Sequence, residues 1–375
     1  MTYKRKLQNI IEENLFKGKL IILYGARRVG KTTLCKTIIG NHKNSKYINC
    51  ELEENRLQLE TTNSLKLKDF LGNYKLIVLD EAHKIKDIGL ILKILVDTFP
   101  EIQIIATGSS SFTLADKASE PLTGRTRTYV MYPLSFQEIN SQFGIAKATG
   151  KLENILRYGS YPSVFTLPEN EAVDELNEIS NKYLYQDILE IEGIKRKNLI
   201  LKILRALAFQ IGNEVSLREI AELVGESDHH IVDRYIATLE ECFVLFRLTP
   251  YSKNLRKEIG SKNKYYFWDL GMRNSLIQQY NHLELRNDVG ALWENYCISE
   301  RLKLNMNTRR HANTYFWRTY DQKEIDYIEE YDGKLEAYEF KWKDNKAKNV
   351  SEFLKTYENS SFKLINKDNF LEFIL

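Results

Sequence analysis

Cysteine is scarce in this sequence, with four in 375 residues. The four positions are Cys35, Cys50, Cys242 and Cys297. None has the C-x-x-C spacing of a zinc site, and no framework of paired cysteines is visible. The sequence therefore predicts neither structural zinc nor disulfides, and we expect a reducing, cytoplasmic compartment.

Long apolar runs are also missing. No run approaches the roughly 18 to 20 residues that a transmembrane helix needs. The N-terminus is basic but lacks the apolar core of a secretory signal. We expect no membrane partner. The net charge of +3 is too small by itself to indicate nucleic acid, whereas the hydrophobic content of 43% is enough to build cores for several domains.

The most specific motif is a phosphate loop at residues 25–32, which read Gly-Ala-Arg-Arg-Val-Gly-Lys-Thr. It directly follows the apolar run at residues 20–23, so we expect a buried strand before it and a helix from about Lys31. Backbone N–H groups and the helix N-terminus then face an anion. Lys31 reaches the β- and γ-phosphates of ATP, and the Thr32 hydroxyl joins the Mg²⁺ shell. The alternative is a glycine turn that only joins strand to helix.

A second apolar strand, at residues 76–79, ends in two acids. Asp80 is expected to hold Mg²⁺ through water, and Glu81 to act as general base. The alternative is a helix cap with first-turn charge. A third strand, at residues 102–107, leads to serines suited to a γ-phosphate sensor or to a simple turn. The expected nucleotide contacts are Gly25, Ala26, Arg27, Arg28, Val29, Gly30, Lys31, Thr32, Thr33, Asp80 and Ser109.

These strands and their helical crossovers predict a three-layer α/β nucleotide domain over residues 1–145. Arg125 follows a glycine in a predicted loop, where it either reaches a γ-phosphate, in the same subunit or across an oligomer interface, or pairs with a surface acid. Ser135 and Glu138 form a capping-box pattern that opens a short helix.

Residues 146–195 read as a helical lid, with helices over 152–158 and from about 169 to 190. Residues 196–285 spell a winged helix-turn-helix: a helix, a capped helix from Ser216 to Gly225, a further helix and a strand hairpin. Residues 247–273 carry a net charge of +5 with interleaved aromatics. Such a hairpin fits DNA phosphates, but winged helices also dock proteins.

The final region, residues 286–375, carries a second chemical pattern. Residues 324–328 and 336–342 form a predicted hairpin that turns at Asp332 and Gly333. Alternation puts Glu339 and Lys341 on one strand face, where Asp326 of the paired strand meets them. Together with Glu294 of the preceding helix, these acids suit Mg²⁺, and Lys341 suits activation of a hydrolytic water. The alternative is an ordinary solvated strand face.

In combination these motifs resemble a family of bacterial and archaeal AAA-like ATPases with a C-terminal domain of unknown function. The resemblance covers nearly the whole chain. It rests on residues 24–32, 79–83, 107–110, 122–125, 132–136, 158–162, 267–271 and 293–295, and on the Asp326, Glu339 and Lys341 set. It implies an ATPase core, a winged helix and a restriction-endonuclease-like PD-(D/E)xK fold. Thr123 departs from the alanine that the family usually has there.

The sequence thus predicts an α/β protein that binds ATP and Mg²⁺, hydrolyses ATP and acts on DNA, with a metal-dependent nuclease site at Asp326, Glu339 and Lys341. The alternative is a nucleotide-switched module that docks a protein partner, or a second copy of itself, and carries an inactive nuclease-like domain.

Overall fold

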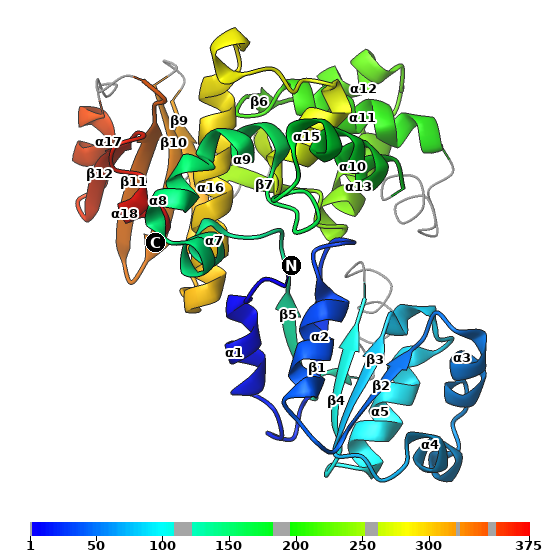
Figure 1. Cartoon of the computed structure of the whole chain (residues 1–375). Coiled ribbons are helices and arrows are strands. Elements are labelled where there is room, and N and C mark those ends of the chain that lie inside the picture. The colour runs from blue at the N-terminus through cyan, green and yellow to red at the C-terminus, as the bar shows by residue number, and fades with distance from the viewer. Residues whose placement is uncertain (1, 109–121, 183–195, 252–261, 320–322, 344–349) are drawn as a thin grey trace. The chain divides into compact units, whose positions relative to one another are not determined.

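A computed structural model describes residues 2–108, 122–182, 196–251, 262–319, 323–343 and 350–375 (Figure 1). The chain divides into two compact units. Unit 1 is Met1–Pro133 with Glu241–Phe243, and unit 2 is Leu134–Glu240 with Val244–Leu375.

Unit 1 is built on a parallel five-stranded sheet with the order β2-β3-β4-β1-β5. Its strands are β1 (Leu20–Tyr24), β2 (Ser45–Asn49), β3 (Leu76–Asp80), β4 (Gln103–Thr107) and β5 (Thr126–Val130). Strands β1, β3 and β4 are buried throughout, as expected for a parallel sheet covered on both faces. The three predicted strands are confirmed.

The helices of unit 1 are α1 (Lys6–Glu12), α2 (Lys31–Gly40), α3 (Glu53–Leu59), α4 (Ser64–Leu71), the 3₁₀ turn η1 (Ala82–Lys84) and α5 (Ile88–Thr98). Helix α2 begins at Lys31, as predicted. Because every strand runs the same way, the ends of β1, β3 and β4 meet at one edge of the sheet.

Unit 2 is built on a mixed seven-stranded sheet with the order β12-β11-β10-β9-β7-β8-β6. Its strands are β6 (Glu214–Val215), β7 (Leu245–Pro250), β8 (Asn263–Phe267), β9 (Asn313–Arg318), β10 (Glu324–Tyr331), β11 (Lys334–Phe340) and β12 (Ser360–Ile365). Strand β7 pairs with β9 in parallel, so one sheet contains strands from both sides of residue 286.

The helices of unit 2 are α7 (Phe136–Phe143), α8 (Ile145–Gly150), α9 (Leu152–Tyr158), α10 (Glu169–Lys182), α11 (Lys197–Phe209), α12 (Leu217–Val224), α13 (His229–Glu241), α15 (Leu270–Ile277), η3 (Leu283–Leu285), α16 (Val289–Thr308), α17 (Ser351–Thr356) and α18 (Leu371–Ile374). The capping box of Ser135 and Glu138 and the helix over 152–158 are confirmed. The division of this unit into lid, winged helix and nuclease-like domain stays a prediction.

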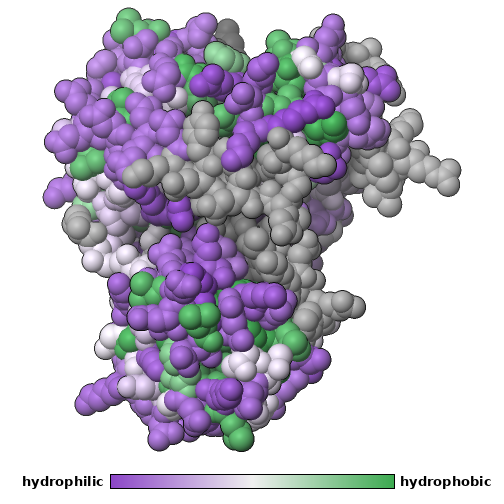
Figure 2. Space-filling view, turned by 90° about the vertical axis from the view of Figure 1, so that its right-hand side faces the viewer, coloured by the Kyte–Doolittle hydropathy of each residue, from purple (hydrophilic) through white to green (hydrophobic). Residues whose placement is uncertain are grey.

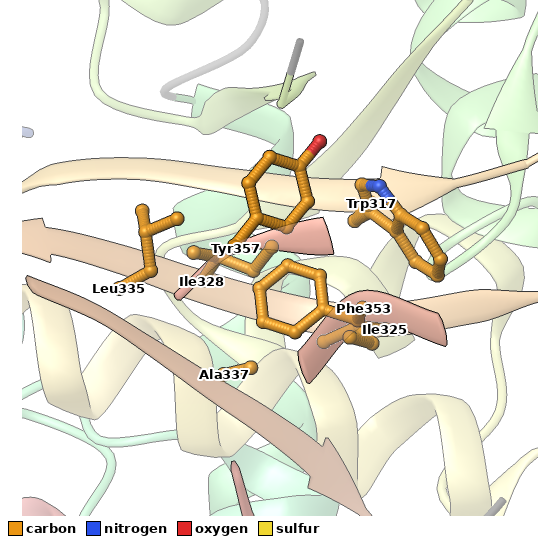
Figure 3. Close-up of a cluster of buried hydrophobic side chains, with 7 residues drawn as sticks. All are labelled: Trp317, Ile325, Ile328, Leu335, Ala337, Phe353 and Tyr357. Carbon is orange, nitrogen blue, oxygen red and sulfur yellow. The ribbon is translucent and has the colours of Figure 1, made fainter. Parts of the chain in front are cut away.

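A hydrophobic cluster joins α17 to strands β9, β10 and β11 (Figure 3). Its members are Trp317, Ile325, Ile328, Leu335, Ala337, Phe353 and Tyr357. Ile325 pairs with Trp317 and Ile328 with Tyr315, so β10 has one residue more than β9 over this stretch, which is a β-bulge. The extra residue lets Ile325 and Ile328 share the cluster although three positions separate them. Asp326 therefore lies in the bulge.

Two glycines bring α9 close to α15. A Cβ on Gly271 would lie 2.1 Å from the carbonyl oxygen of Tyr158, and one on Gly159 would lie 2.1 Å from Asp269 Oδ1. Asp269 caps α15 and accepts the Ser160 N–H at 2.7 Å. The motifs at 158–162 and 267–271 are thus two sides of one packing joint.

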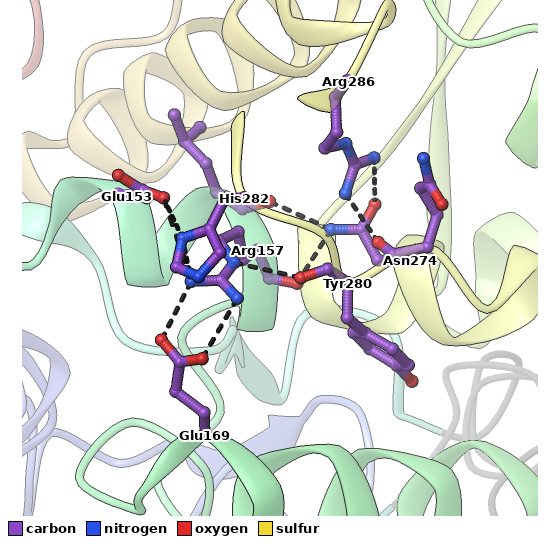
Figure 4. Close-up of polar contacts among 9 residues, drawn as sticks. Glu153, Arg157, Glu169, Asn274, Tyr280, His282 and Arg286 are labelled. Atoms are coloured by element: carbon purple, nitrogen blue, oxygen red, sulfur yellow. Dashed lines mark hydrogen bonds and ion pairs between the residues drawn. The ribbon is translucent and has the colours of Figure 1, made fainter. Parts of the chain in front are cut away.

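Hydrogen bonds extend this joint (Figure 4). Arg157 of α9 forms a bidentate pair with Glu169 of α10 and donates to the Tyr280 carbonyl at 3.0 Å. Asn274 of α15 donates to the carbonyl of Arg157 at 2.8 Å and accepts from Arg286 at 3.0 Å. The helices of the predicted lid are therefore fixed to the helix that follows β8.

On the face drawn in Figure 2, hydrophobic residues form small separate areas among hydrophilic ones. Within the described ranges, no helix combines the length and the apolar character that crossing a bilayer requires.

Candidate nucleotide site and a second polar cluster

The phosphate loop joins β1 to α2 in a backbone conformation that requires glycine. Gly25 has a φ of 147°, and a Cβ there would lie 2.2 Å from the carbonyl oxygen of Met131. Gly30, at the N-cap of α2, has a φ of 102°. The sequence therefore folds this loop against the end of β5 and aims it at the start of α2, where backbone N–H groups bind anions.

The Lys31 side chain lies across the loop. It is 5% exposed, and its ammonium donates to the carbonyls of Gly25 at 2.7 Å and Ala26 at 3.0 Å. Ala26 and Val29 are buried, whereas Arg28 and Thr33 are exposed and Arg27 is half-buried. The predicted contact residues thus surround one loop, with a buried ammonium beside it.

Asp80 collects hydroxyl groups from three other elements. Its Oδ2 accepts from Thr32 at 2.7 Å and from Tyr47 at 2.5 Å, and its Oδ1 accepts from Thr107 at 2.6 Å. Mg²⁺ prefers carboxylate and hydroxyl oxygens of this kind. The pairing of Thr32 with Asp80 therefore fits the predicted Mg²⁺ site, and the Tyr47 contact is one for which the sequence offered no signal.

Thr107 is the hydroxyl residue that the structure places between the phosphate loop and β3. Strand β4 lies between β1 and β3, and Thr107 is its last residue. The Thr107 hydroxyl also accepts the Glu81 N–H at 2.9 Å. The predicted sensor, Ser109, lies outside the described residues. In the sequence Thr107 is the end of a predicted strand, and nothing local distinguishes its hydroxyl from those of the serines that follow.

Glu81 follows β3 with a positive φ of 53°, an unusual conformation for a residue with a side chain. His83 Nδ1 lies 3.2 Å from Glu81 Oε2. Burial raises the pKa of Glu81, Lys31 offsets part of this rise and Asp80 adds to it. A carboxylate with a raised pKa is a stronger proton acceptor, which suits a general base.

Arg5 braces the loop from the N-terminal segment. Its Nη1 donates to the Val29 carbonyl at 2.7 Å, and its Nη2 donates to the Tyr132 carbonyl at 2.6 Å. The side chain is 7% exposed. This role has no signal in the sequence, since nothing local links Arg5 to residues so distant in the chain.

Arg125 is not brought to the loop within unit 1. It precedes β5, and its carbonyl accepts the N–H of Leu20, the first residue of β1. The phosphate loop follows the last residue of β1, so Arg125 stands at the opposite edge of the sheet. Its guanidinium pairs with Asp97 at 2.6 Å, which is the surface pair that the sequence left as the alternative. A role across an oligomer interface stays a prediction.

Comparison with known families assigns the region that contains this site to a family of domains. Residues 17–140 match the model of an AAA domain. The N-terminal part of the chain is an AAA-type P-loop ATPase domain. Residues 149–283 and 289–370 match two domains of unknown function, DUF8612 and DUF4143. The boundaries of the AAA-type domain include the loop, Asp80, Glu81 and Thr107.

Two relatives that match most of the chain are uncharacterised proteins. One, from Methanocaldococcus jannaschii, is 26% identical over 394 residues, covering 96% of this chain and 87% of that protein. Another, from Mycobacterium tuberculosis, is 26% identical over 333 residues, covering 87% of this chain and 71% of that protein. A Walker-type ATPase of Pyrococcus abyssi superposes with a TM-score of 0.52 at 16% identity, over 74% of this chain and 96% of that one. At this identity the likeness concerns the fold alone.

Beyond the AAA-type domain, unit 2 gathers the predicted acids of the second site. Glu339 is fully buried, and Lys341 Nζ lies 3.1 Å from its Oε1. Burial lowers the pKa of Lys341, but Glu339, Asp326 and Glu294 outweigh it and raise that pKa. Asp326 Oδ2 accepts the Phe340 N–H at 2.9 Å. The acids of α16, β10 and β11 therefore all act on one ammonium.

The carboxylate oxygens of Glu294, Asp326 and Glu339 are not as close to one another as the ligand atoms of a metal site. Of the described part of the chain, only Asp228, His229 and His230, at the start of α13, have ligand atoms within 4.8 Å of one another in a group of three or more. They are consecutive, and they are exposed or half-buried. The set of Glu294, Asp326 and Glu339 is looser than that.

One of the basic residues of the predicted 247–273 hairpin lies in this cluster of acids. Lys264 of β8 is 1% exposed, and its Nζ lies 3.3 Å from Glu294 Oε1 and 2.5 Å from Glu324 Oε1. Tyr266 donates to the same Glu294 oxygen at 2.6 Å. Lys264 and Tyr266 are functional candidates that were not predicted from the sequence. A lysine beside aromatic residues in a strand is ordinarily expected to lie on the surface.

The basic character predicted for residues 247–273 is reduced by such internal pairs. Arg247 pairs with Glu240 at 3.0 Å and Asp233 at 3.3 Å. Arg273 is 2% exposed and pairs with Asp288 at 2.6 Å. With Lys264, three of the cations therefore have carboxylate partners inside the fold, and residues 252–261 lie outside the described ranges.

Proposed function

We propose that unit 1 hydrolyses ATP with Mg²⁺. The observation that carries the proposal is the meeting of the glycine loop, Lys31 and the Asp80 hydroxyl cluster at one sheet edge. In this proposal Lys31 and the loop N–H groups bind the β- and γ-phosphates, while Thr32 and Asp80 hold Mg²⁺. The metal neutralises charge that develops on the phosphate oxygens.

Glu81 is the proposed base in this reaction. Its carboxylate accepts a proton from the attacking water, and its backbone is held by the hydrogen bond to Thr107. His83, 3.2 Å from the Glu81 carboxylate, is placed to orient it. Burial on one side and Lys31 on the other set the proton affinity of Glu81.

The test is ATP turnover by Lys31→Ala, with Lys43→Ala as the control. Lys43 is exposed and follows α2, so its removal changes the charge of the unit equally without touching the loop. We expect Lys31→Ala to lose about 100-fold or more in turnover, the effect of removing one charged phosphate contact. Unchanged turnover in Lys31→Ala would refute the assignment.

A second candidate function is metal-dependent DNA cleavage by unit 2. It is favoured by the convergence of Glu294, Asp326 and Glu339 on Lys341. Plasmid cleavage with Mn²⁺, with and without ATP, tests it. We expect Glu339→Ala to abolish cleavage and Glu358→Ala, which alters an exposed acid after α17, to leave it unchanged. If no condition yields cleavage, the nuclease-like assignment is left without an activity.

The proposed partner of unit 2 is DNA, and a protein is the alternative. The order α11, β6, α12, α13, β7 and β8 supports a winged helix. Helix α13 itself carries Asp233, Glu240 and Glu241 against one arginine, Arg234, and no lysine. DNA binding through phosphates must weaken steeply with salt, because counterions are released. A salt-independent interaction with a protein would favour the alternative.

A further inference from the structure

The carboxylate cluster of unit 2 contains its own cation. Four acids contribute to it: Glu294 from α16, Glu324 and Asp326 from β10, and Glu339 from β11. Lys341 forms an ion pair with Glu339, whereas Lys264 forms ion pairs with Glu294 and Glu324. The ammonium of Lys264 is thus shared by acids from two elements, which is the arrangement that a bound metal would otherwise provide.

The surroundings of Lys264 hold it in this place. Its side chain is 1% exposed, and the Phe316 ring lies 5.5 Å from its ammonium. Its ammonium lies 3.3 Å from Glu294 Oε1 and 2.5 Å from Glu324 Oε1, so moving the lysine to water would leave two half-buried acids without this partner.

The ligand oxygens are also partly occupied. Glu294 Oε1 receives both Lys264 and the Tyr266 hydroxyl, and Asp326 Oδ2 receives the Phe340 N–H. A divalent ion entering beside a fixed positive charge is repelled by it in a medium of low dielectric constant. This explains why the acids gather without forming a tight group.

We propose that Lys264 is the resident cation of this cluster and that its ammonium sets the affinity of the cluster for divalent metal. In the wild-type chain the lysine keeps that affinity low. Metal binds tightly only when the lysine is removed or displaced. The proposal rests on the carboxylate cluster of the second candidate function, but its test measures metal binding without DNA, so its failure is distinguishable from a lack of cleavage.

The experiment is a titration of the full chain with Mn²⁺, in which electron paramagnetic resonance measures the bound metal. It compares the Lys264→Met variant with the wild type. This variant keeps the apolar stem and removes the charge. We expect its cluster to bind Mn²⁺ about 100-fold more tightly than the wild type, from the loss of one nearby unit charge. The gain should disappear in Lys264→Met/Glu294→Gln, which removes one carboxylate charge.

The matched control is Lys303→Met. Lys303 of α16 is also buried and pairs with Glu300 at 2.8 Å, outside the cluster. We expect it to show the wild-type response. Equal affinity in Lys264→Met and wild type would overturn the proposal, as would tight wild-type binding that Glu294→Gln abolishes. If Lys264→Met is unfolded in chelator, recovery of its native circular dichroism on adding Mn²⁺ supports the proposal, and no recovery contradicts it.

Discussion

Thr107 has two partners in the nucleotide site. Its hydroxyl donates to Asp80 and accepts from the Glu81 backbone, so it fixes both acids at once. Replacing it with valine keeps the shape, leaves the half-buried Glu81 N–H without this acceptor and costs about 1–3 kcal/mol of interaction. We expect Thr107→Val to lower kcat for ATP about tenfold or more, and Thr107→Ser to retain most of it. A loss in Thr107→Ser with none in Thr107→Val would show that the methyl group, not the hydroxyl, matters.

The pKa of Glu81 gives a pH prediction. The residue acts as a base only when ionised, and burial raises its pKa from the ordinary 4.5. The acid limb of the kcat profile is therefore expected above pH 4.5, with kcat falling as the pH drops. Steady-state hydrolysis across pH measures this, and Glu81→Gln should be nearly inactive at every pH. An acid limb at or below 4.5 would contradict the assignment.

The raised pKa of Glu81 affects stability and activity in opposite directions as the pH changes. A carboxyl whose pKa is higher in the folded state binds protons more tightly there than in the unfolded chain. The contribution of Glu81 to the free energy of unfolding is therefore fully present below its unfolded pKa, and it is lost as the pH rises through the folded pKa. Activity and stability are thus expected to respond to this group in opposite directions.

At the scale of elements, the close packing of α9 against α15 can be tested by adding one methyl group at Gly271. A Cβ on Gly271 would meet the Tyr158 carbonyl at 2.1 Å, so Gly271→Ala forces the helices apart. We expect a loss of about 3 kcal/mol in the free energy of unfolding, measured by denaturant titration.

Gly290 is the matched control for that change. It lies in α16 with nothing within 4 Å of an added Cβ. Gly290→Ala should leave stability unchanged or raise it by up to about 1 kcal/mol, because alanine favours a helix. A Gly271→Ala variant as stable as Gly290→Ala would mean that the two helices are free to separate.

Elements were predictable from sequence where the signal was local. Apolar runs marked β1, β3 and β4, the Ser135 and Glu138 spacing marked the start of α7, and Asp332 with Gly333 marked the β10–β11 turn. The pairing of β7 with β9 has no local signal, because it joins residues far apart in the chain. The partners of Arg125 and Lys264 have no local signal for the same reason, because the fold around a cation decides which acid it contacts.

At the scale of the molecule, the two compact units predict two thermal transitions. A ligand that binds only the folded form of one unit stabilises that unit alone, by about 2.7 kcal/mol at 100 times its Kd. We expect ATP with Mg²⁺ to raise one calorimetric transition and leave the other in place. Lys31→Ala should abolish the shift. One shared transition that moves as a whole would show that the units unfold together.

Arg5 gives unit 1 a mechanical property. Its guanidinium spans from the Val29 carbonyl, in the phosphate loop, to the Tyr132 carbonyl, one residue before the first segment of the unit ends at Pro133. Because a guanidinium is flat and rigid, the two carbonyls are held at a nearly constant separation. The Arg5 side chain therefore fixes the phosphate loop to the end of the first segment of unit 1, and we expect a displacement of the loop to move Tyr132 with it.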